Sequence, residues 1–333
     1  MKLTRQEEAV LTALQRGVEP VERPFCNMPL PEDAVVDLLQ RAQAEGLIRR
    51  FGGVFDARRL GYKSVLCAVD IDESQMEQTA EMIAAHPGVT HCYERRPVVG
   101  GREYPVLWFT LALQHDRFDE GLAQMQMQLG AKRVLLLPAL RRFKIDVVFD
   151  LRTQERDETF PGAAAPASAQ SRLTESFESF TEDERAIVRA LEGNLAVSAR
   201  PFDAAAGQLG IPVSVLLARL NDWRRKGVLR RVGVILYHRE AGFKANGMCV
   251  WPVEGDIVAA GRRVASRPEV THCYQRPRLP GFPFDLYAMI HTGSPAETKA
   301  LFDKITAACG LPDGELFISL REFKKSSMHY FQE

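Results

Sequence analysis

The stretch THCYERRP at residues 90–97 returns almost unchanged as THCYQRPR at residues 271–278, about half a chain further on. In an extended strand, alternate side chains share one face. His91, Tyr93 and Arg95 therefore point one way, and the residues between them point the other way. A strand with apolar surroundings on both faces would not carry these side chains. The stretch predicts a sheet with one helix-covered face and one open face that carries His, Tyr and Arg.

This stretch belongs to a repeat that covers nearly the whole chain. TRQEEAVLTAL at residues 4–14 matches TEDERAIVRAL at residues 181–191, and each begins with the residues of a helix capping box. LRRFK at residues 140–144 matches LREFK at residues 320–324. Between the two copies, residues 152–172 are rich in Ala, Pro and Ser without periodicity, which predicts a linker.

Composition narrows the class of protein. The 333 residues allow two or more domains, and 43 acidic residues balance 43 basic ones, so no global attraction to nucleic acid or to anionic membranes is expected. No apolar run reaches the length of a membrane span, and the first residues lack the core of a signal peptide. Six scattered cysteines form no Cys-x-x-Cys pair, which favours reduced thiols. We expect a soluble cytoplasmic protein without membrane contact.

Within each copy the pattern changes once, from helical spacing to strands. Gly46 and Gly227 are expected to end the third helix of each copy as left-handed caps. The β-rich runs at residues 47–55 and 228–236 then resemble the wing of a helix-turn-helix domain. The rest of each copy predicts strand, helix, strand, strand, helix, strand, which is the ferredoxin-like order. The predicted fold is α+β, a tandem repeat of winged helix-turn-helix and ferredoxin-like domains.

The two open sheet faces can pack against each other as an intramolecular pseudo-dimer with a pseudo-two-fold axis. A pocket between them would contain histidines, tyrosines and guanidinium groups, and arginine binds carboxylates bidentately. These side chains could instead be hydrogen-bonded interface residues, but the joint recurrence of His and Arg favours a site. The predicted boundaries are residues 1–60 and 173–241 for the winged-helix domains and 61–151 and 242–333 for the ferredoxin-like domains.

A winged helix followed by a ferredoxin-like domain resembles the Lrp/AsnC transcription regulators, which need a basic recognition helix. The first candidate helix carries Glu32, Asp33 and Asp37 against Arg41. These carboxylates would repel phosphates, and even weak DNA binding needs several basic contacts. We therefore expect both winged helices to be structural, without DNA as a partner. Transcription regulation of the Lrp/AsnC kind, with DNA and a small effector as ligands, is the alternative function.

Longer motifs sharpen the resemblance. RRVGVILYHREAGFK at residues 230–244, THCYQR at 271–276 and REFKKSSMHYF at 321–331 together resemble the siroheme decarboxylases, which are Lrp/AsnC-like proteins. The first copy, with RRFGGVFDARRLGY at residues 49–62 and HCYERR at 91–96, is similar to the partner subunit of that family. The whole chain resembles the fused NirD–NirL type.

This resemblance implies removal of the C12 and C18 acetate carboxyl groups of siroheme in haem d1 biosynthesis. The product would be 12,18-didecarboxysiroheme, with two molecules of carbon dioxide. The macrocycle delocalises charge and brings its own iron, so no added cofactor or metal is expected. Siroheme is the expected partner, and a further oligomer is left open. A tetrapyrrole carrier without chemistry is a third possible function.

The resemblance also implies site residues. The family's histidine falls on His238, and the equivalent first-copy position is Ala57, so we expect one competent site around His238 and His272. A histidine with a pKa near 6.5 is a suitable proton donor at neutral pH, although either histidine could instead bind the siroheme iron. The expected substrate-binding residues are Arg231, Arg276, Tyr274, His91, Arg95, Tyr93, Arg50 and Lys324.

Overall fold

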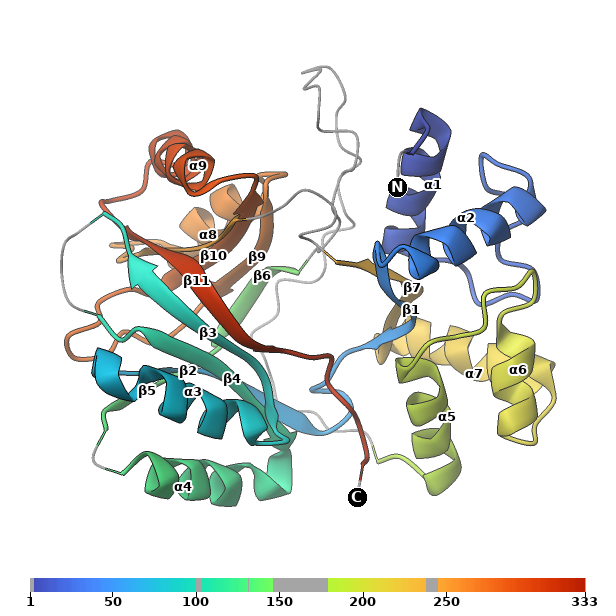
Figure 1. Cartoon of the computed structure of the whole chain (residues 1–333), viewed down its shortest axis with the longest axis horizontal. Helices are drawn as coiled ribbons and strands as arrows, with labels where there is room; N and C mark the ends of the chain where they lie inside the picture. The colour runs from blue at the N-terminus through green and yellow to red at the C-terminus, as the bar shows by residue number, and fades with distance from the viewer. Residues whose placement is uncertain (1–2, 100–103, 131, 146–178, 238–244, 333) are drawn as a thin grey trace.

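The structure is a computed structural model that describes residues 3–99, 104–130, 132–145, 179–237 and 245–332. A curled sheet with helices outside it forms one block, and a helical unit built from both copies forms the other (Figure 1). The predicted linker at 152–172 lies outside the described residues.

The helical unit begins in each copy with a capped helix. Thr4 accepts a hydrogen bond from the backbone of Glu7, and Thr181 does the same for Glu184, so both predicted capping boxes are confirmed. Gly227 has a left-handed backbone with φ of 75°, as predicted for a helix end. The helices of this unit are α1 (Arg5–Arg16), α2 (Glu32–Ala44), α5 (Glu182–Glu192), α6 (Phe202–Gln208) and α7 (Val213–Lys226).

The two copies differ in their number of helices. Gly46 has the predicted positive φ, but among the described residues it follows the second helix of the first copy, not a third one. The segment equivalent to α6 begins at Phe25 and contains Pro29. Proline has no amide hydrogen and disrupts a helix interior, so this segment stays irregular.

The two runs predicted as wings each form a single strand. These strands, β1 (Ile48–Phe55) and β7 (Leu229–Leu236), pair antiparallel with each other across the two copies. One apolar core, which includes Leu11, Phe51 and Trp223, therefore serves both helical regions. The winged helices are fused into one unit.

The remaining elements confirm the ferredoxin-like order in both copies. The first copy contains β2 (Tyr62–Val69), η1 (Glu73–Gln75), α3 (Met76–Ala85), β3 (Val89–Pro97), β4 (Leu107–Gln114), η2 (His115–Arg117), α4 (Phe118–Leu129), β5 (Val134–Pro138) and β6 (Arg141–Ile145). The second contains β8 (Ala245–Trp251), α8 (Ile257–Ala265), β9 (Val270–Gln275), β10 (Leu286–Thr292), α9 (Pro295–Ala308) and β11 (Glu315–Lys325).

The two copies exchange the ends of their last strands. The strand order is β5-β2-β4-β3-β11-β8-β10-β9-β6, so β11 joins β3 of the first copy and β6 joins β9 of the second. Only Ala139 and Leu140 separate β5 from β6, although these strands lie at opposite ends of the order. The sheet therefore curls until its two ends meet.

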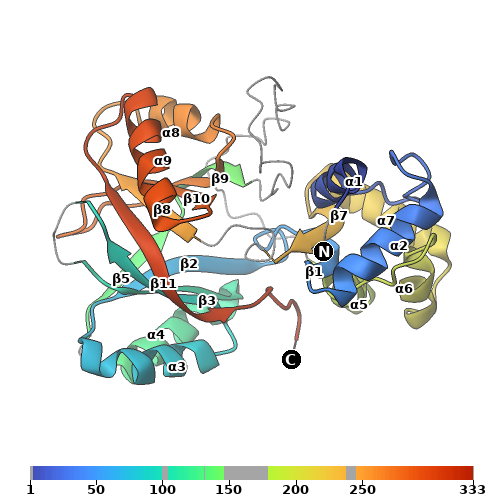
Figure 2. The ribbon, with the colours of Figure 1, turned by 45° about the horizontal axis from the view of Figure 1, so that its top comes forward.

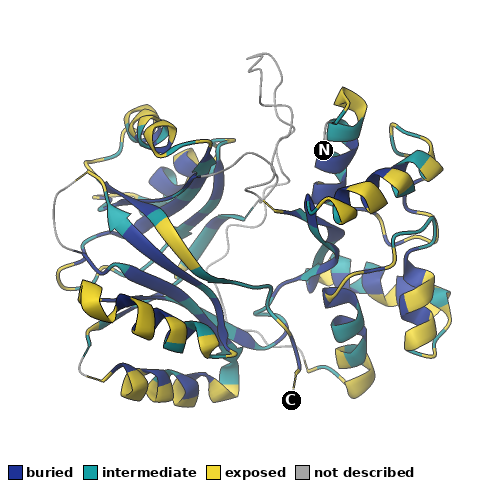
Figure 3. Cartoon of the chain, in the orientation of Figure 1, coloured by how far each residue is buried: buried dark blue, intermediate teal, exposed yellow. Residues whose placement is uncertain are grey.

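The faces of the sheet are divided as the sequence predicted. The helices α3 and α4 cover one copy and α8 and α9 cover the other, on opposite outer sides (Figure 2). Cys92 and Cys273 are buried beneath these helices. The inner faces of the two copies share a separate apolar cluster that includes Trp108, Met248 and Phe317. Burial is greatest along these strands and least on the outer helices (Figure 3). Among the described residues, no helix is both long and apolar enough to span a membrane.

Candidate functional site: a cavity lined by arginines

The His-Tyr-Arg pattern forms the same stack of side chains in both copies. The ring centroids of His272 and Tyr274 lie 6.3 Å apart at an interplanar angle of 23°, and the Arg276 guanidinium lies 5.1 Å from the Tyr274 centroid. The equivalent rings of His91 and Tyr93 lie 6.1 Å apart. The prediction that these side chains share one inner face is therefore confirmed.

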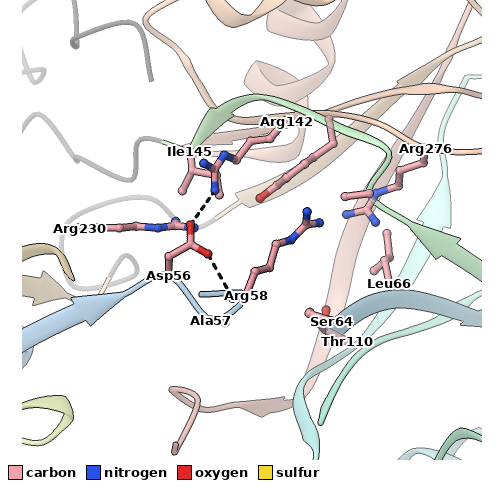
Figure 4. Close-up of a pocket in the computed structure, with 12 residues that line it drawn as sticks. Asp56, Ala57, Arg58, Ser64, Leu66, Thr110, Arg142, Ile145, Arg230 and Arg276 are labelled. Atoms are coloured by element: carbon pink, nitrogen blue, oxygen red, sulfur yellow. Dashed lines mark hydrogen bonds and ion pairs between the residues drawn. The ribbon is translucent and has the colours of Figure 1, made fainter. Parts of the chain in front are cut away.

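A cavity of about 220 Å³ lies beside the second of these strands, between the sheet and the helical unit (Figure 4). Both copies contribute to it, because β6 of the first copy pairs with β9 of the second. Four arginines, one aspartate and several small polar or apolar residues line it. The lining residues are Asp56, Ala57, Arg58, Ser64, Leu66, Thr110, Ala139, Arg142, Ile145, Arg230, Tyr274 and Arg276.

Asp56 anchors two of the four arginines. Its Oδ2 accepts hydrogen bonds from Arg230 Nη2 at 2.8 Å and from Arg142 Nη1 at 3.2 Å. Burial raises the pKa of the Asp56 carboxyl, but the charges and hydrogen bonds of Arg230 and Arg142 outweigh it and lower this pKa to about 2. One fixed carboxylate therefore faces four guanidinium groups, and the cavity is suited to an anionic ligand.

Arg276 and its counterpart Arg95 have different surroundings. Arg276 lines the cavity, donates to the carbonyl oxygen of Leu137, and lies over the rings of Tyr274 and Tyr287. Arg95 is 6 % exposed, and its Nε donates to Ser319 Oγ at 3.2 Å. Burial lowers the pKa of Arg95 to about 10. Arg276 can reach a ligand in the cavity, whereas Arg95 is committed to protein contacts.

His272 lies on the same strand face as Tyr274, and its Cα partner on β6 is Ile145, which lines the cavity. Burial, with the charges of Arg230 and Arg276, lowers the pKa of His272 to about 4. The imidazole is therefore neutral at pH 7. Its Nδ1 lies 3.1 Å from the hydroxyl of Thr271.

The first-copy histidine has a similar environment. Burial, with the charges of Lys325, Arg49 and Arg95, lowers the pKa of His91 to about 3. The Nδ1 atom of His91 lies 3.0 Å from the hydroxyl of Thr90. Both histidines are neutral at physiological pH in the unliganded protein.

Of the predicted residues that the structure describes, only Tyr274 and Arg276 are among the lining residues of the cavity. His272 and the first-copy stack of His91, Tyr93 and Arg95 are not among them, and three further predicted residues lie elsewhere. Arg50 donates to the backbone carbonyls of Gly53, at 3.0 Å, and of Glu192 within the helical unit. Lys324 projects to the helix-covered side, where its Nζ donates to the His86 carbonyl at 3.0 Å. Arg231 is half-buried on β7 and does not line this cavity. His238 lies outside the described residues.

Arg276 was predicted, but the sequence did not identify the other three arginines that line the cavity, Arg58, Arg142 and Arg230. In the pairing of β1 with β7, Val54 is opposite Arg231 and Phe55 is opposite Leu229, so Arg230 is the extra residue of a bulge. A bulge redirects a side chain, and it directs the first arginine of the pair into the cavity instead of the second. Arg142 reaches the cavity only because β6 crosses to the other copy, and the sequence does not reveal this crossing. Asp56 and Arg58 flank Ala57, the first-copy position equivalent to His238.

Among the described residues, no group of His, Cys, Asp and Glu side chains could hold a metal ion. The cationic groups of the cavity instead suit carboxylates, since each planar guanidinium can donate two parallel hydrogen bonds to one carboxylate.

Both copies of the sheet match a known ligand-binding class. Residues 59–144 and 240–324 match the family model for an AsnC-like ligand binding domain. Residues 184–230 match the model for the siroheme decarboxylase NirDL-like helix-turn-helix domain. The fold and the cavity between the copies thus define a protein with a duplicated AsnC-like ligand-binding domain.

Full-length relatives identify the family more closely. A siroheme decarboxylase of Hydrogenobacter thermophilus is 32% identical over 98% of this chain and 95% of its own length. A siroheme decarboxylase NirDL subunit of Paracoccus pantotrophus is 31% identical over 91% of this chain and 89% of its own. The chain belongs to the siroheme decarboxylase family, in its fused NirDL form.

A solved structure extends this similarity to three dimensions. The siroheme decarboxylase NirDL in complex with an iron-uroporphyrin III analogue superposes with a TM-score of 0.72 at 28% identity. The match covers 99% of this chain and 95% of that one. The resemblance predicted from the sequence motifs is therefore confirmed along nearly the whole chain.

Proposed function

We propose that this protein is a carboxy-lyase that removes the C12 and C18 acetate carboxyl groups of siroheme, giving 12,18-didecarboxysiroheme and carbon dioxide in haem d1 biosynthesis. The observation that carries the proposal is the cavity in which four arginines face a single carboxylate. Siroheme has acetate and propionate arms around its ring, and such a polyanion complements this charge. Membership of the siroheme decarboxylase family supports the same substrate.

The arginines bind and orient the substrate. Arg276 is held over two tyrosine rings, and Arg142 and Arg230 are held by Asp56, so their guanidinium groups are positioned before a ligand arrives. Preorganised groups lose little entropy on binding and can fix the ring in one orientation. Tyr274, which lines the cavity beside them, contributes a flat surface and a hydroxyl group.

Each decarboxylation breaks the bond between the acetate methylene and its carboxylate. Carbon dioxide leaves, the electron pair remains on the methylene carbon and is delocalised into the macrocycle, and one proton converts that carbon into a methyl group. We assign the delivery of this proton to His272. The neutral imidazole must first acquire the proton, and the incoming carboxylates favour this because a nearby negative charge raises the pKa of a histidine.

His238 stays a proposed catalytic residue on the family resemblance alone, and Arg231, Arg50 and Lys324 stay proposed carboxylate ligands on the same basis. His91, Tyr93 and Arg95 form the equivalent stack in the first copy. We assign these three residues a structural role on the inner face of the sheet, opposite the proposed second-copy site. Siroheme supplies the iron, and the proposed reaction uses no further cofactor.

The proposal is tested by anaerobic incubation of the protein with siroheme, followed by mass spectrometry of the extracted pigment. Two successive losses of carbon dioxide are expected. An unchanged pigment with a shifted absorption spectrum would instead identify a carrier. No interaction with siroheme, together with tight sequence-specific DNA binding in a gel shift, would identify a regulator. Loss of the spectral shift in His272→Ala would show that this histidine binds the iron.

A further inference from the structure

The four arginines of the cavity are not equivalent. Arg142 and Arg230 form ion pairs with Asp56, and Arg276 donates to a backbone carbonyl and stacks on two tyrosines. The guanidinium of Arg58 has no hydrogen bond or ion pair with any residue that the structure describes. Figure 4 shows its side chain extending into the space between Asp56 and Arg276.

The neighbouring carboxylate is already occupied. Asp56 Oδ2 accepts hydrogen bonds from Arg142 and Arg230, while Oδ1 accepts the backbone N–H of Arg58 itself at 3.1 Å. The last bond fixes the start of the Arg58 loop and leaves its guanidinium directed elsewhere. Asp56 therefore positions the Arg58 backbone and attracts its guanidinium through space, although among the described residues the two side chains form no hydrogen bond or ion pair with each other.

A half-buried guanidinium without a hydrogen bond or ion pair to the part of the chain that the structure describes is unfavourable for the unliganded protein. Burial lowers the pKa of Arg58, because the charged form loses part of its hydration. A buried charge without a partner destabilises a fold, whereas an apolar residue of similar volume often does not. The Arg58 side chain thus costs stability that an arriving carboxylate can restore.

We propose that Arg58 is the open carboxylate ligand of the cavity, which binds one peripheral carboxylate of the tetrapyrrole through two parallel hydrogen bonds. The Ser64 and Thr110 side chains line the same part of the cavity and supply hydroxyl groups beside it. This inference rests on the proposed function and identifies the residue that recognises the substrate's carboxylates. The bound carboxylate belongs either to an acetate arm or to a propionate arm of the tetrapyrrole. Two porphyrins that differ in these arms distinguish the two cases.

The test compares Arg58→Met with the unchanged protein in two measurements. The first is the affinity for iron uroporphyrin, which has acetate and propionate arms, and for iron coproporphyrin, which has propionate arms only. We expect Arg58→Met to weaken iron uroporphyrin binding about tenfold or more, as for loss of a charge-assisted bidentate pair. The second is the melting temperature without ligand, which we expect to rise by a few degrees.

Arg59→Met is the matched control, because Arg59 is the next residue of the same loop and does not line the cavity. It should leave the affinity for both porphyrins unchanged and should not raise the melting temperature. Loss of affinity for iron uroporphyrin alone assigns Arg58 to an acetate arm. Loss for both porphyrins assigns it to a propionate arm.

Two results would overturn the role of Arg58. Unchanged affinity of Arg58→Met for both porphyrins would show that it binds no carboxylate. A lower melting temperature would show that its guanidinium already has a stabilising partner in the unliganded protein. If the unchanged protein binds neither porphyrin, the proposed function itself fails. This failure is measured without any variant, so it differs from a failure of the role proposed for Arg58.

Discussion

The strands β3 and β9 carry the same residues in the same order, yet only β9 borders the arginine-lined cavity. Each places a histidine against a tyrosine and an arginine over that tyrosine's ring. The difference lies in the neighbouring strand, which comes from the other copy in both cases. The surroundings of the motif, more than the motif itself, distinguish the two copies, and we propose that they decide which copy binds the ligand.

The neighbouring strands have opposite charges at equivalent positions. On β6, Arg142 pairs with Tyr274, and on β11, Glu322 pairs with Tyr93. Burial and the neighbouring charge of Glu322 raise the pKa of the Tyr93 hydroxyl. At this one position the charge attracts a carboxylate ligand beside β9 and repels it beside β3. The duplicated site has diverged by the exchange of a few residues on a crossing strand.

The largest expected effect distinguishes the two histidines. His272→Ala should lower the rate of siroheme decarboxylation about 100-fold, the usual loss for a general acid. His91→Ala should lower it less than about tenfold, since its strand lies beside Glu322. The rates are measured under anaerobic conditions with saturating siroheme. Equal losses in the two variants, with melting temperatures unchanged, would show that the two copies act equally.

The next effect concerns the carboxylate that holds the arginines. Asp56→Asn should lower the free energy of unfolding at pH 7 by about 2 kcal/mol, because the folded pKa of about 2 lies below the ordinary 3.8. The contribution is fully present above pH 3.8 and is lost as the pH falls toward 2. Urea unfolding at several pH values measures it.

The second copy provides the control for this prediction, because Tyr237 occupies the position equivalent to Asp56 and is 47% exposed. Tyr237→Phe should leave the free energy of unfolding unchanged at every pH. A deficit in Asp56→Asn that persists unchanged at pH values near 2 would contradict the ion-pair explanation.

A smaller effect tests the charge difference between the crossing strands. Arg142→Gln should weaken the binding of iron uroporphyrin about tenfold, because one guanidinium is removed from the cavity. Glu322→Gln, the equivalent change on β11, should leave the affinity the same or raise it slightly. Absorption titrations at fixed ionic strength measure both. A larger loss in Glu322→Gln than in Arg142→Gln would place the ligand beside β3 instead.

The sequence predicted what depends on local patterns. The capping residues Thr4 and Thr181 and the positive φ of Gly46 and Gly227 have short-range causes and are confirmed. The number of helices before Gly46 was wrong, because that glycine follows the second helix of its copy. The common face of His272, Tyr274 and Arg276 followed from strand alternation alone, and the repeat made it visible twice.

The cavity arginines depend on pairings between distant parts of the chain. Arg142 reaches the site because β6 leaves its own copy, and no local pattern encodes that crossing. Arg230 is directed inward by a bulge, which shifts the alternation by one residue. The irregular segment before α2 differs from the helical pattern of the second copy, because a proline in it disrupts a helix.

The smallest expected effect concerns the hydrogen bond that orients His272. The Thr271 hydroxyl lies 3.2 Å from the Met289 carbonyl oxygen, to which it can only donate, and 3.1 Å from His272 Nδ1. Its single hydrogen goes to the carbonyl, so the neutral imidazole donates from Nδ1 and has its lone pair on Nε2. Nε2 is then the nitrogen that can accept and deliver the proton.

Thr271→Val removes the acceptor for Nδ1–H while keeping the shape of the side chain. We expect a roughly threefold to tenfold fall in kcat with KM unchanged, and recovery in Thr271→Ser, which restores the hydroxyl. Nitrogen NMR of the labelled, unliganded protein should show the proton on Nδ1 of His272 and a mixture of tautomers in Thr271→Val. Thr90→Val, the same change beside His91, should leave kcat nearly constant, because the first-copy histidine delivers no proton. A proton found on Nε2 of His272 in the unchanged protein would contradict this orientation, and would do so whether or not the enzyme turns over.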